Sequence, residues 1–261
     1  MKHLKKFETT AEYNAYTADT ANLVFPNTSV CLDAPATVHY NQPPDPYGGH
    51  EYVEIGGVKW STMNLGATGI TDSGLYFQWA DTQGYTSGQC GSGSSKKYFG
   101  FTDTKYWTGD TGNGESGYTK YNNTDGKTVL EASDDAAAAN WGGNWRMPTY
   151  EDFKALRTSV IYIDANGNEL GPFENHKITL SGVTGVYFQD STDPTKRLFF
   201  PSAGLCYDGS LKSSGDSSIW TSSIKQFGIN MPNAWCRYGE DVYWDVGSPR
   251  SRGLNIRPVA D

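Results

Sequence analysis

The sequence of 261 residues contains few charged side chains, few histidines and few cysteines. Charged residues make up 19% of the chain and leave a formal net charge of −8, with no stripe of Lys and Arg. Nucleic acids and anionic membrane surfaces attract proteins with clustered basic residues. We therefore expect no nucleic-acid partner and no binding to an anionic membrane.

Long apolar runs are also missing. No stretch is long enough to span a bilayer, so we expect no membrane insertion. The basic residues Lys2, Lys5 and Lys6 are followed at once by polar residues from Glu8 onward, which is not the pattern of a secretory signal. We expect either a processed N-terminus or export by another route, such as packaging into a virus particle.

Motifs of catalysis and metal binding are absent. The four histidines are scattered and none stands in a metal-ligand spacing. No G-x-S-x-G nucleophile motif occurs. We expect a non-enzymatic protein without a cofactor. Calcium is the alternative, but it needs about six to eight converging oxygens, and the sequence does not place them. The acidic loop residues that would have to supply them are Asp103, Asp110, Asp125, Asp190 and Asp193.

No two of the four cysteines, Cys31, Cys90, Cys206 and Cys236, form a C-x-x-C motif, which argues against zinc or thioredoxin-type chemistry. A chain of this length can bury enough apolar surface without disulfides. We expect free thiols, and the sequence leaves open whether Cys206 and Cys236 pair.

Aromatic residues and glycine are abundant, at 14% of the chain and 30 residues. This composition favours short strands joined by many turns. Together with two short helical patterns, it predicts an α+β fold class in which strands dominate the second half of the chain.

A linker is predicted at residues 41–49, which contain three prolines and two glycines. It separates an N-terminal segment, residues 1–47, from one large domain, residues 51–261. In the first segment, Thr9 and Glu12 form a capping-box pattern that predicts a helix near 10–19, and a hairpin is expected within 30–40.

Local signals predict several elements in the large domain. Gly56-Gly57 indicates a tight hairpin turn between 52–55 and 58–60, and the aromatic run 74–80 is expected to be a strand. Residues 84–128 are expected to be mostly loops.

Two helices are predicted in the middle of this domain. Asp134 is expected to cap an Ala-rich helix at 135–140. Thr149 with Asp152 indicates a second helix that buries Phe153 and Leu156.

Six sequence strings occur in an order that resembles the Fibrobacter-type major paralogous domain. The strings are 58–66, 74–80, 145–153, 200–204, 219–223 and 253–259. That family is related to formylglycine-generating enzymes and to the variable proteins of diversity-generating retroelements, and the resemblance implies a C-type lectin-like fold for 51–261. Core packing is expected for the large apolar residues Trp60, Trp145, Phe200 and Trp220. Arg257 is expected either to pair with a buried carboxylate or to be solvated.

The N-terminal segment resembles the attachment segments of phage structural proteins from gut bacteria. The resemblance is carried by residues 5–16, 26–31 and 38–41. It implies a location in the virion, at the phage tail, where this segment contacts other virion proteins. The alternative is an ordinary small subdomain.

Residues 224–252 are predicted to form the ligand-binding surface. The segment mixes Trp, Tyr, Phe, Arg and Asp with a lone Cys and follows no clean period. Trp, Tyr and Arg are enriched at binding hot spots. The expected ligand is a bacterial surface protein or glycan. The candidate ligand-binding residues are Phe227, Trp235, Cys236, Arg237, Tyr238, Tyr243, Trp244, Asp245, Arg250 and Arg252.

The resemblance to retroelement variable proteins also implies which positions vary. Replacing the adenines of an asparagine codon cannot give Trp, so Trp235 and Trp244 are expected to be fixed scaffold or fixed anchors. The candidates for varied positions are Phe227, Gly228, Cys236, Arg237, Tyr238, Tyr243, Asp245, Val246, Arg250 and Arg252. The plain alternative is an exposed strand–loop–strand without diversification.

Three functions follow as hypotheses. The first is a phage tail receptor-binding protein diversified in its C-terminal segment and displayed in several copies, as in a homo-oligomer. The second is an adhesin or lectin module of the bacterial cell surface with a fixed ligand. The third, remote hypothesis is a formylglycine-generating-type oxidase that uses Cys206 and Cys236, whose surroundings do not match that motif.

Overall fold

The computed structural model describes residues 5–7, 29–31, 45–109, 117–171, 174–225 and 231–261. The chain divides into two compact units, 1–49 and 50–261. In the first unit, β1 (Lys5–Phe7) pairs in parallel with β2 (Ser29–Cys31). The helix expected near 10–19 and most of the hairpin expected within 30–40 lie outside the described residues.

The large unit is mostly β-structure, and the expected α+β class is wrong. Strands account for 36% of the structure and helices for 12%. The α-helices among the described residues are α2 (Ala136–Trp141) and α3 (Tyr150–Ser159). Both are short because the helical patterns in the sequence are short, whereas the Gly- and aromatic-rich stretches around them favour strands and turns.

The first hairpin of the large unit matches its sequence signal. β3 (Tyr52–Ile55) pairs with β4 (Val58–Ser61) in antiparallel register. Gly56 and Gly57 have φ of 63° and 75°, as a two-residue turn with positive φ at both positions requires. Two short strands, β15 (Val259–Ala260) and β5 (Trp145–Arg146), complete the sheet in the order β3-β4-β15-β5.

Helix α2 begins one residue later than expected. Its N-cap is Asp135, whose Oδ1 accepts hydrogen bonds from the backbone N–H groups of Ala137 and Ala138 at 2.9 and 3.0 Å. The neighbouring Asp134 instead accepts hydrogen bonds from Lys105 Nζ and the Tyr121 hydroxyl, both at 2.6 Å. Burial of its side chain would raise the pKa of Asp134, but these donors hold that pKa well below its usual range.

Helix α3 confirms its predicted cap and buried face. Thr149 and Asp152 form the capping box, with the Asp152 N–H donating to Thr149 Oγ1 at 3.2 Å. Phe153 and Leu156 are both fully buried, so one face of α3 covers the core.

Three further sheets build the rest of the unit. β8 pairs with β6, β7 and β9, and the β10–β11 hairpin stands alone. These strands are β6 (Val160–Tyr162), β7 (Ile178–Leu180), β8 (Val183–Asp190), β9 (Arg197–Pro201), β10 (Leu205–Tyr207) and β11 (Ser210–Lys212).

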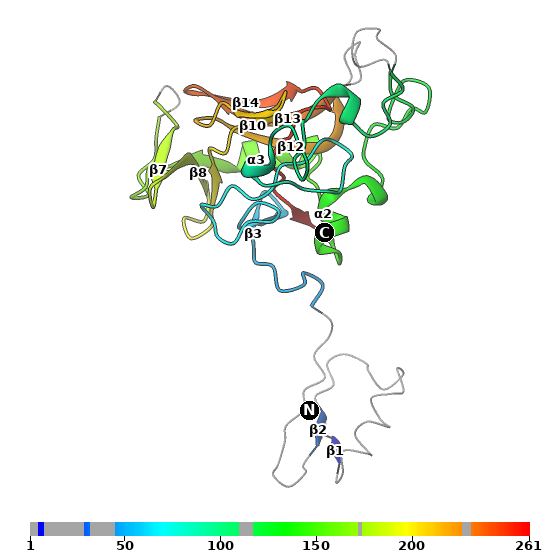
Figure 1. Ribbon diagram of the computed structural model, residues 1–261. Coiled ribbons are helices and arrows are strands. Elements are labelled where there is room, and N and C mark those ends of the chain that lie inside the picture. The colour runs from blue at the N-terminus through cyan, green and yellow to red at the C-terminus, as the bar shows by residue number, and fades with distance from the viewer. Residues whose placement is uncertain (1–4, 8–28, 32–44, 110–116, 172–173, 226–230) are drawn as a thin grey trace. The chain divides into compact units, whose positions relative to one another are not determined.

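A three-stranded sheet carries the segment of interest. It consists of β12 (Ser217–Lys225), β13 (Met231–Tyr238) and β14 (Asp241–Gly247), all antiparallel and in that order. Figure 1 shows the three strands together along one side of the large unit, with α3 below them. No other described strand pairs with β14, so β14 is an edge strand.

The large aromatic residues fill the core as expected. Trp60, Trp145, Phe200 and Trp220 are at most 2% exposed. Residues 76–80 of the run 74–80 are buried too, but the run is not a strand. Tyr76 and Phe77 make isolated bridges to two different segments, at Tyr85 and Leu254, so the run pairs with no single partner strand.

The expectation of free thiols is wrong for Cys90 and Cys206. These residues form a disulfide, with Cα atoms 5.8 Å apart and a sequence separation of 116. The bond is buried beside Phe99 and Ala203. It ties the loop region around Cys90 to strand β10, and it leaves Cys236 as a free thiol.

Arg257 is not solvated, and it pairs with no carboxylate among the described residues. Its side chain is fully buried and donates to Asn64 Oδ1 at 3.0 Å, to the Ser61 carbonyl at 3.1 Å and to the Phe199 carbonyl at 2.7 Å. Burial lowers the pKa of Arg257. The guanidinium therefore links the β4 end of one sheet to β9 of another.

Among the described residues, no helix has the length and apolar character needed to cross a membrane.

Candidate functional site

Strands β13 and β14 present two different faces. Trp235 and Trp244 point into the core, where each ring lies 6.4 Å from the ring of Phe153. Cys236 and Tyr243, which are opposite each other in register, lie on the other face of the sheet. The hairpin therefore has a supporting face and an open face.

A β-bulge adjusts the open face. The register between β13 and β14 shifts between Ala234 and Cys236, which sets Trp244 and Asp245 opposite Trp235. The extra residue moves Val246 onto the same face as Tyr243, although the two are three positions apart.

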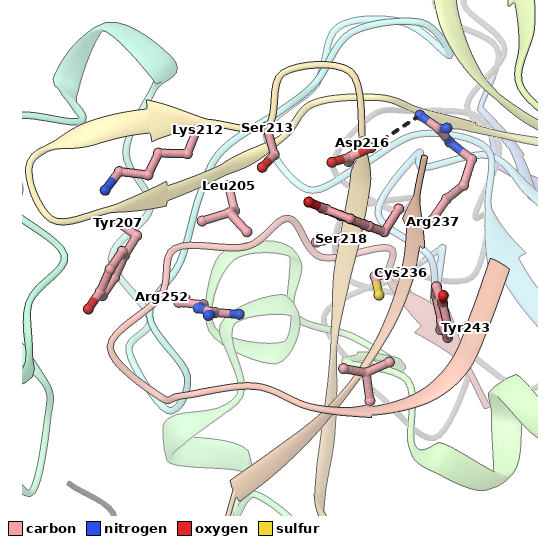
Figure 2. A pocket seen from close by; sticks show the side chains of 12 residues that line it. Leu205, Tyr207, Lys212, Ser213, Asp216, Ser218, Cys236, Arg237, Tyr243 and Arg252 are labelled. Carbon is pink, nitrogen blue, oxygen red and sulfur yellow. Dashed lines mark ion pairs between the residues drawn. The ribbon is translucent and has the colours of Figure 1, made fainter. Parts of the chain in front are cut away.

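The open face forms one wall of a pocket of about 480 Å³ (Figure 2). The opposite wall comes from the β10–β11 hairpin, and the segment after β14 closes the pocket. Several positions singled out in the sequence meet here: Cys236, Arg237, Tyr238, Tyr243, Val246 and Arg252.

The other half of the pocket was missed by the sequence reasoning. It is lined by Leu205, Tyr207, Lys212, Ser213, Asp216 and Ser218. A local signal for its hairpin existed, since Asp208-Gly209 is a typical two-residue turn and both residues have positive φ, 50° and 67°. No local signal shows that this hairpin lies against β13, because that depends on long-range contacts such as the pairing of Cys206 with Gly253.

Tyr238 and Tyr243 are the exposed aromatic residues of the open face. Tyr238 is 66% exposed and Tyr243 is 45% exposed. Large apolar residues that remain in water on a rigid strand supply contact area at a low cost in side-chain entropy. Both side chains are therefore accessible to a ligand.

Arg237 differs from the expected exposed contact residue. Its side chain is fully buried, and it donates to Ser202 Oγ at 2.9 Å and to the carbonyls of Gly215 and Gly239. Asp216 lies 3.9 Å away as an ion-pair partner. Arg237 therefore stabilises the pocket wall, because its side chain joins the turn after β13, at Gly239, to the segment before β12, at Gly215.

Arg250 also differs, and it is not a contact residue. It is 1% exposed, its Nη1 donates to the Lys120 carbonyl at 2.9 Å, and its guanidinium lies 4.2 Å from the ring centre of Tyr118. The backbone at Arg250 is also held against the core, since the backbone N–H of Trp79 donates to the Arg250 carbonyl at 3.2 Å.

Three other candidates do not join the pocket surface. Trp235 and Trp244 pack in the core, so the expectation that they contact a ligand is wrong for both. Asp245 is exposed but pairs with Lys225 at 3.1 Å and borders a separate cavity of about 450 Å³. Phe227 lies outside the described residues.

A more polar cavity of about 750 Å³ adjoins the beginning of β14. Tyr243 and Trp244 line it together with Tyr162 and His176, whose rings stack at 3.8 Å. The β13–β14 hairpin thus borders several hollows of the surface.

Cys236 is the free thiol on the pocket wall. Burial raises the pKa of the Cys236 thiol to about 11, so this thiol is neutral at physiological pH. Within the described ranges, no group of three His, Cys, Asp or Glu side chains is placed to hold a metal ion.

Comparison of the chain with protein-family models, curated proteins and solved structures found no match. The resemblance noted in the sequence therefore stays a prediction.

Proposed function

We propose that this chain is a non-enzymatic ligand-binding protein whose contact surface is the open face of the β13–β14 hairpin and the adjoining pocket. One observation carries the proposal. Six of the positions singled out in the sequence, between Cys236 and Arg252, come together around a single pocket, while Trp235 and Trp244 support them from the core. A concave, largely apolar surface with a few polar groups is the usual form of a binding site.

The mechanism is display on a fixed framework. The residues that support the sheet are buried, and the residues of the open face, such as Tyr238 and Tyr243, remain in contact with water. Substitutions at exposed positions usually change stability by only about 0.5 kcal/mol. The open face can therefore change its chemistry at little cost to the fold.

We further propose that the protein acts in a phage tail, where this face is diversified by a retroelement and recognises a bacterial surface protein or glycan. The exposure of Tyr238 and Tyr243, in contrast to the buried Trp235 and Trp244, supports this version, whereas Arg237 and Arg250 are buried and do not support it. A second DNA copy of the region encoding 224–252, differing mainly at adenines and lying beside a reverse transcriptase gene, is its expected genomic signature. A single fixed copy with an upstream signal sequence would favour a cell-surface adhesin instead.

The oxidase hypothesis has less support. It needs the thiols of both Cys206 and Cys236, but Cys206 is bonded to Cys90. The raised pKa of Cys236 further disfavours a reactive thiolate at neutral pH.

Binding to whole cells tests the proposed function. The fluorescently labelled full chain is incubated with a panel of gut bacterial strains, and bound label is measured by flow cytometry. We expect the double variant Tyr238→Ala/Tyr243→Ala to bind a recognised strain at least about tenfold more weakly, as for loss of a hot spot. Tyr52→Ala is the matched control, because Tyr52 is similarly exposed (40%) and does not line the pocket.

Equal binding by the double variant and the Tyr52 control would contradict the proposal. So would oxygen uptake with a cysteine-containing peptide and copper, which the third hypothesis predicts.

A further inference from the structure

The charges around the pocket are not balanced. Asp216 is the only carboxylate among the described residues that line it, and Asp216 lies 3.9 Å from Arg237 Nη2. Asp216 also accepts a hydrogen bond from the Gly239 N–H at 3.1 Å. The one anion of the pocket is thus already engaged on the β13 side.

Two cations remain on the other side, at Lys212 and Arg252. Both lie over the ring of Tyr207, with Lys212 Nζ at 4.9 Å and Arg252 Cζ at 5.8 Å from its centre. Neither forms an ion pair with any described carboxylate within 4.0 Å, and Arg252 Nε is buried without a hydrogen-bond partner in the described part of the chain. Figure 2 shows Lys212, Tyr207 and Arg252 together on one side of the pocket and the Arg237–Asp216 pair on the other.

Apart from Ser213 and Ser218, the rest of the pocket is apolar or aromatic, with Leu205, Tyr243 and Val246 on its walls. The Cys236 thiol adds no charge, because burial raises its pKa to about 11. A ligand that fits these walls carries an apolar or aromatic group next to an anion.

The net charge of −8 does not prevent this. At physiological ionic strength, charges farther away than about 8 Å are largely screened. The two cations within the pocket therefore dominate the potential that a bound group experiences.

Strand β14 favours a peptide over a glycan as the occupant. It is the edge strand of its sheet in the described structure, and Tyr243 and Val246 extend from it into the pocket. An extended peptide can pair with a strand edge through its backbone while one side chain enters an adjacent pocket. A glycan would instead need several hydrogen-bonding side chains, and the pocket is mainly apolar.

We infer that the pocket binds an acidic peptide segment of a partner protein, with a carboxylate between Lys212 and Arg252 and a neighbouring apolar or aromatic side chain against Leu205 and Val246. This inference rests on the proposed function, since it names the ligand of the same surface. The carboxylate would receive charge-assisted hydrogen bonds from the two cations.

Selection from a random heptapeptide library on the immobilised full chain tests the inference. We expect enrichment of Asp or Glu next to Leu, Phe, Tyr or Trp. The most enriched peptide and its counterpart with Gln or Asn in place of the acid are then compared by fluorescence anisotropy. The neutral peptide should bind at least about tenfold more weakly, and added salt should reduce the difference.

Variants locate the interaction. Lys212→Gln/Arg252→Gln should remove the preference for the acidic peptide, whereas Lys154→Gln, at an exposed lysine of α3 that does not line the pocket, should keep it. Thermal unfolding checks that the double variant folds. If it does not fold, the comparison of acidic and neutral peptides on the wild-type chain still decides.

Enrichment of neutral or basic peptides, or equal affinity for the acidic and neutral peptides, would overturn the inference. If no peptide is enriched but cell binding still depends on Tyr238 and Tyr243, the peptide ligand is wrong and the proposed function stands. If the chain binds acidic glycans on an array but no acidic peptides, the peptide ligand is likewise wrong and the proposed function stands. Loss of both peptide and cell binding would overturn both proposals.

Discussion

Arginine side chains act as internal braces in this protein. Arg237, Arg250 and Arg257 are each at most 1% exposed and donate to backbone carbonyls. A buried charge is costly unless hydrogen bonds replace its water. Each of these guanidinium groups joins segments that are distant in sequence, so removing one would leave several carbonyls without a donor.

Cys236 offers a test of burial at the pocket wall. Its pKa is raised to about 11 from an ordinary value near 9, because burial disfavours the thiolate. At pH 8 the thiolate fraction then falls roughly a hundredfold relative to an unshifted thiol. We expect iodoacetamide to label Cys236 about a hundredfold more slowly in the folded chain than in urea, with mass spectrometry of the Cys236 peptide as readout.

The pH dependence of the labelling rate shows whether the pKa of Cys236 is raised in the folded chain. In the folded chain the labelling rate should keep rising about tenfold per pH unit beyond pH 9, whereas in urea it should level off near pH 9. A folded-state rate that also levels off near pH 9 would show that Cys236 is not shielded.

At the scale of single residues, the sequence predicted the burial of the large aromatic residues better than the burial of the arginines. It predicted that Trp60 and Trp220 are buried and selected Tyr238 and Tyr243 as contact residues, which are exposed. It assigned Arg250 to the surface because an arginine has no local signal of burial. The carbonyl partners of Arg250 come from residues 120 and 121, which only the tertiary fold brings near.

At the scale of single elements, the turn at Gly56-Gly57 connects the first hairpin to the rest of the fold. A Cβ on Gly56 would lie 2.8 Å from the Ala155 carbonyl oxygen and from Ser159 Oγ, both on α3. A Cβ on Gly57 would meet nothing within 4 Å. The turn therefore needs glycine at one position for its conformation and at the other also for space.

These two glycines should differ in their cost of substitution. Gly57→Ala should destabilise the chain by about 1 kcal/mol, since only the positive φ opposes it. Gly56→Ala adds the clash with α3 and should cost about 2–3 kcal/mol. Urea unfolding measures both, with Gly57→Asn as a control that tolerates positive φ better. Equal costs at the two positions would show that α3 does not press against the turn.

Elements with strong local signals were predicted well. The glycine turn defined β3 and β4, and the Thr149–Asp152 capping box defined the start of α3. The run 74–80 was predicted as a strand on its aromatic content alone and is not one, because Tyr76 and Phe77 bridge to two different segments instead of to one partner strand. The predicted α+β class was wrong because it relied on the clear local signals of two short helices, whereas most of the many short strands lack such signals.

At the scale of the whole molecule, the pocket depends on contacts that sequence patterns do not reveal. Its two walls come from residues 205–218 and 236–252. The Cys90–Cys206 disulfide anchors β10, and Cys206 pairs with Gly253 beyond the second wall. No local sequence pattern indicates that these two walls lie against each other, so only the β13–β14 half of the site could be found from the sequence.

The central claim is that β13 and β14 display a changeable face on a fixed framework. Saturation mutagenesis of residues 231–252, scored by the free energy of unfolding of each variant, tests it without knowledge of the ligand. We expect most substitutions at Tyr238 and Tyr243 to change the free energy by no more than about 0.5 kcal/mol. Trp235→Ala and Trp244→Ala should each cost about 3–5 kcal/mol. Similar losses at the tyrosines and the tryptophans would contradict the account.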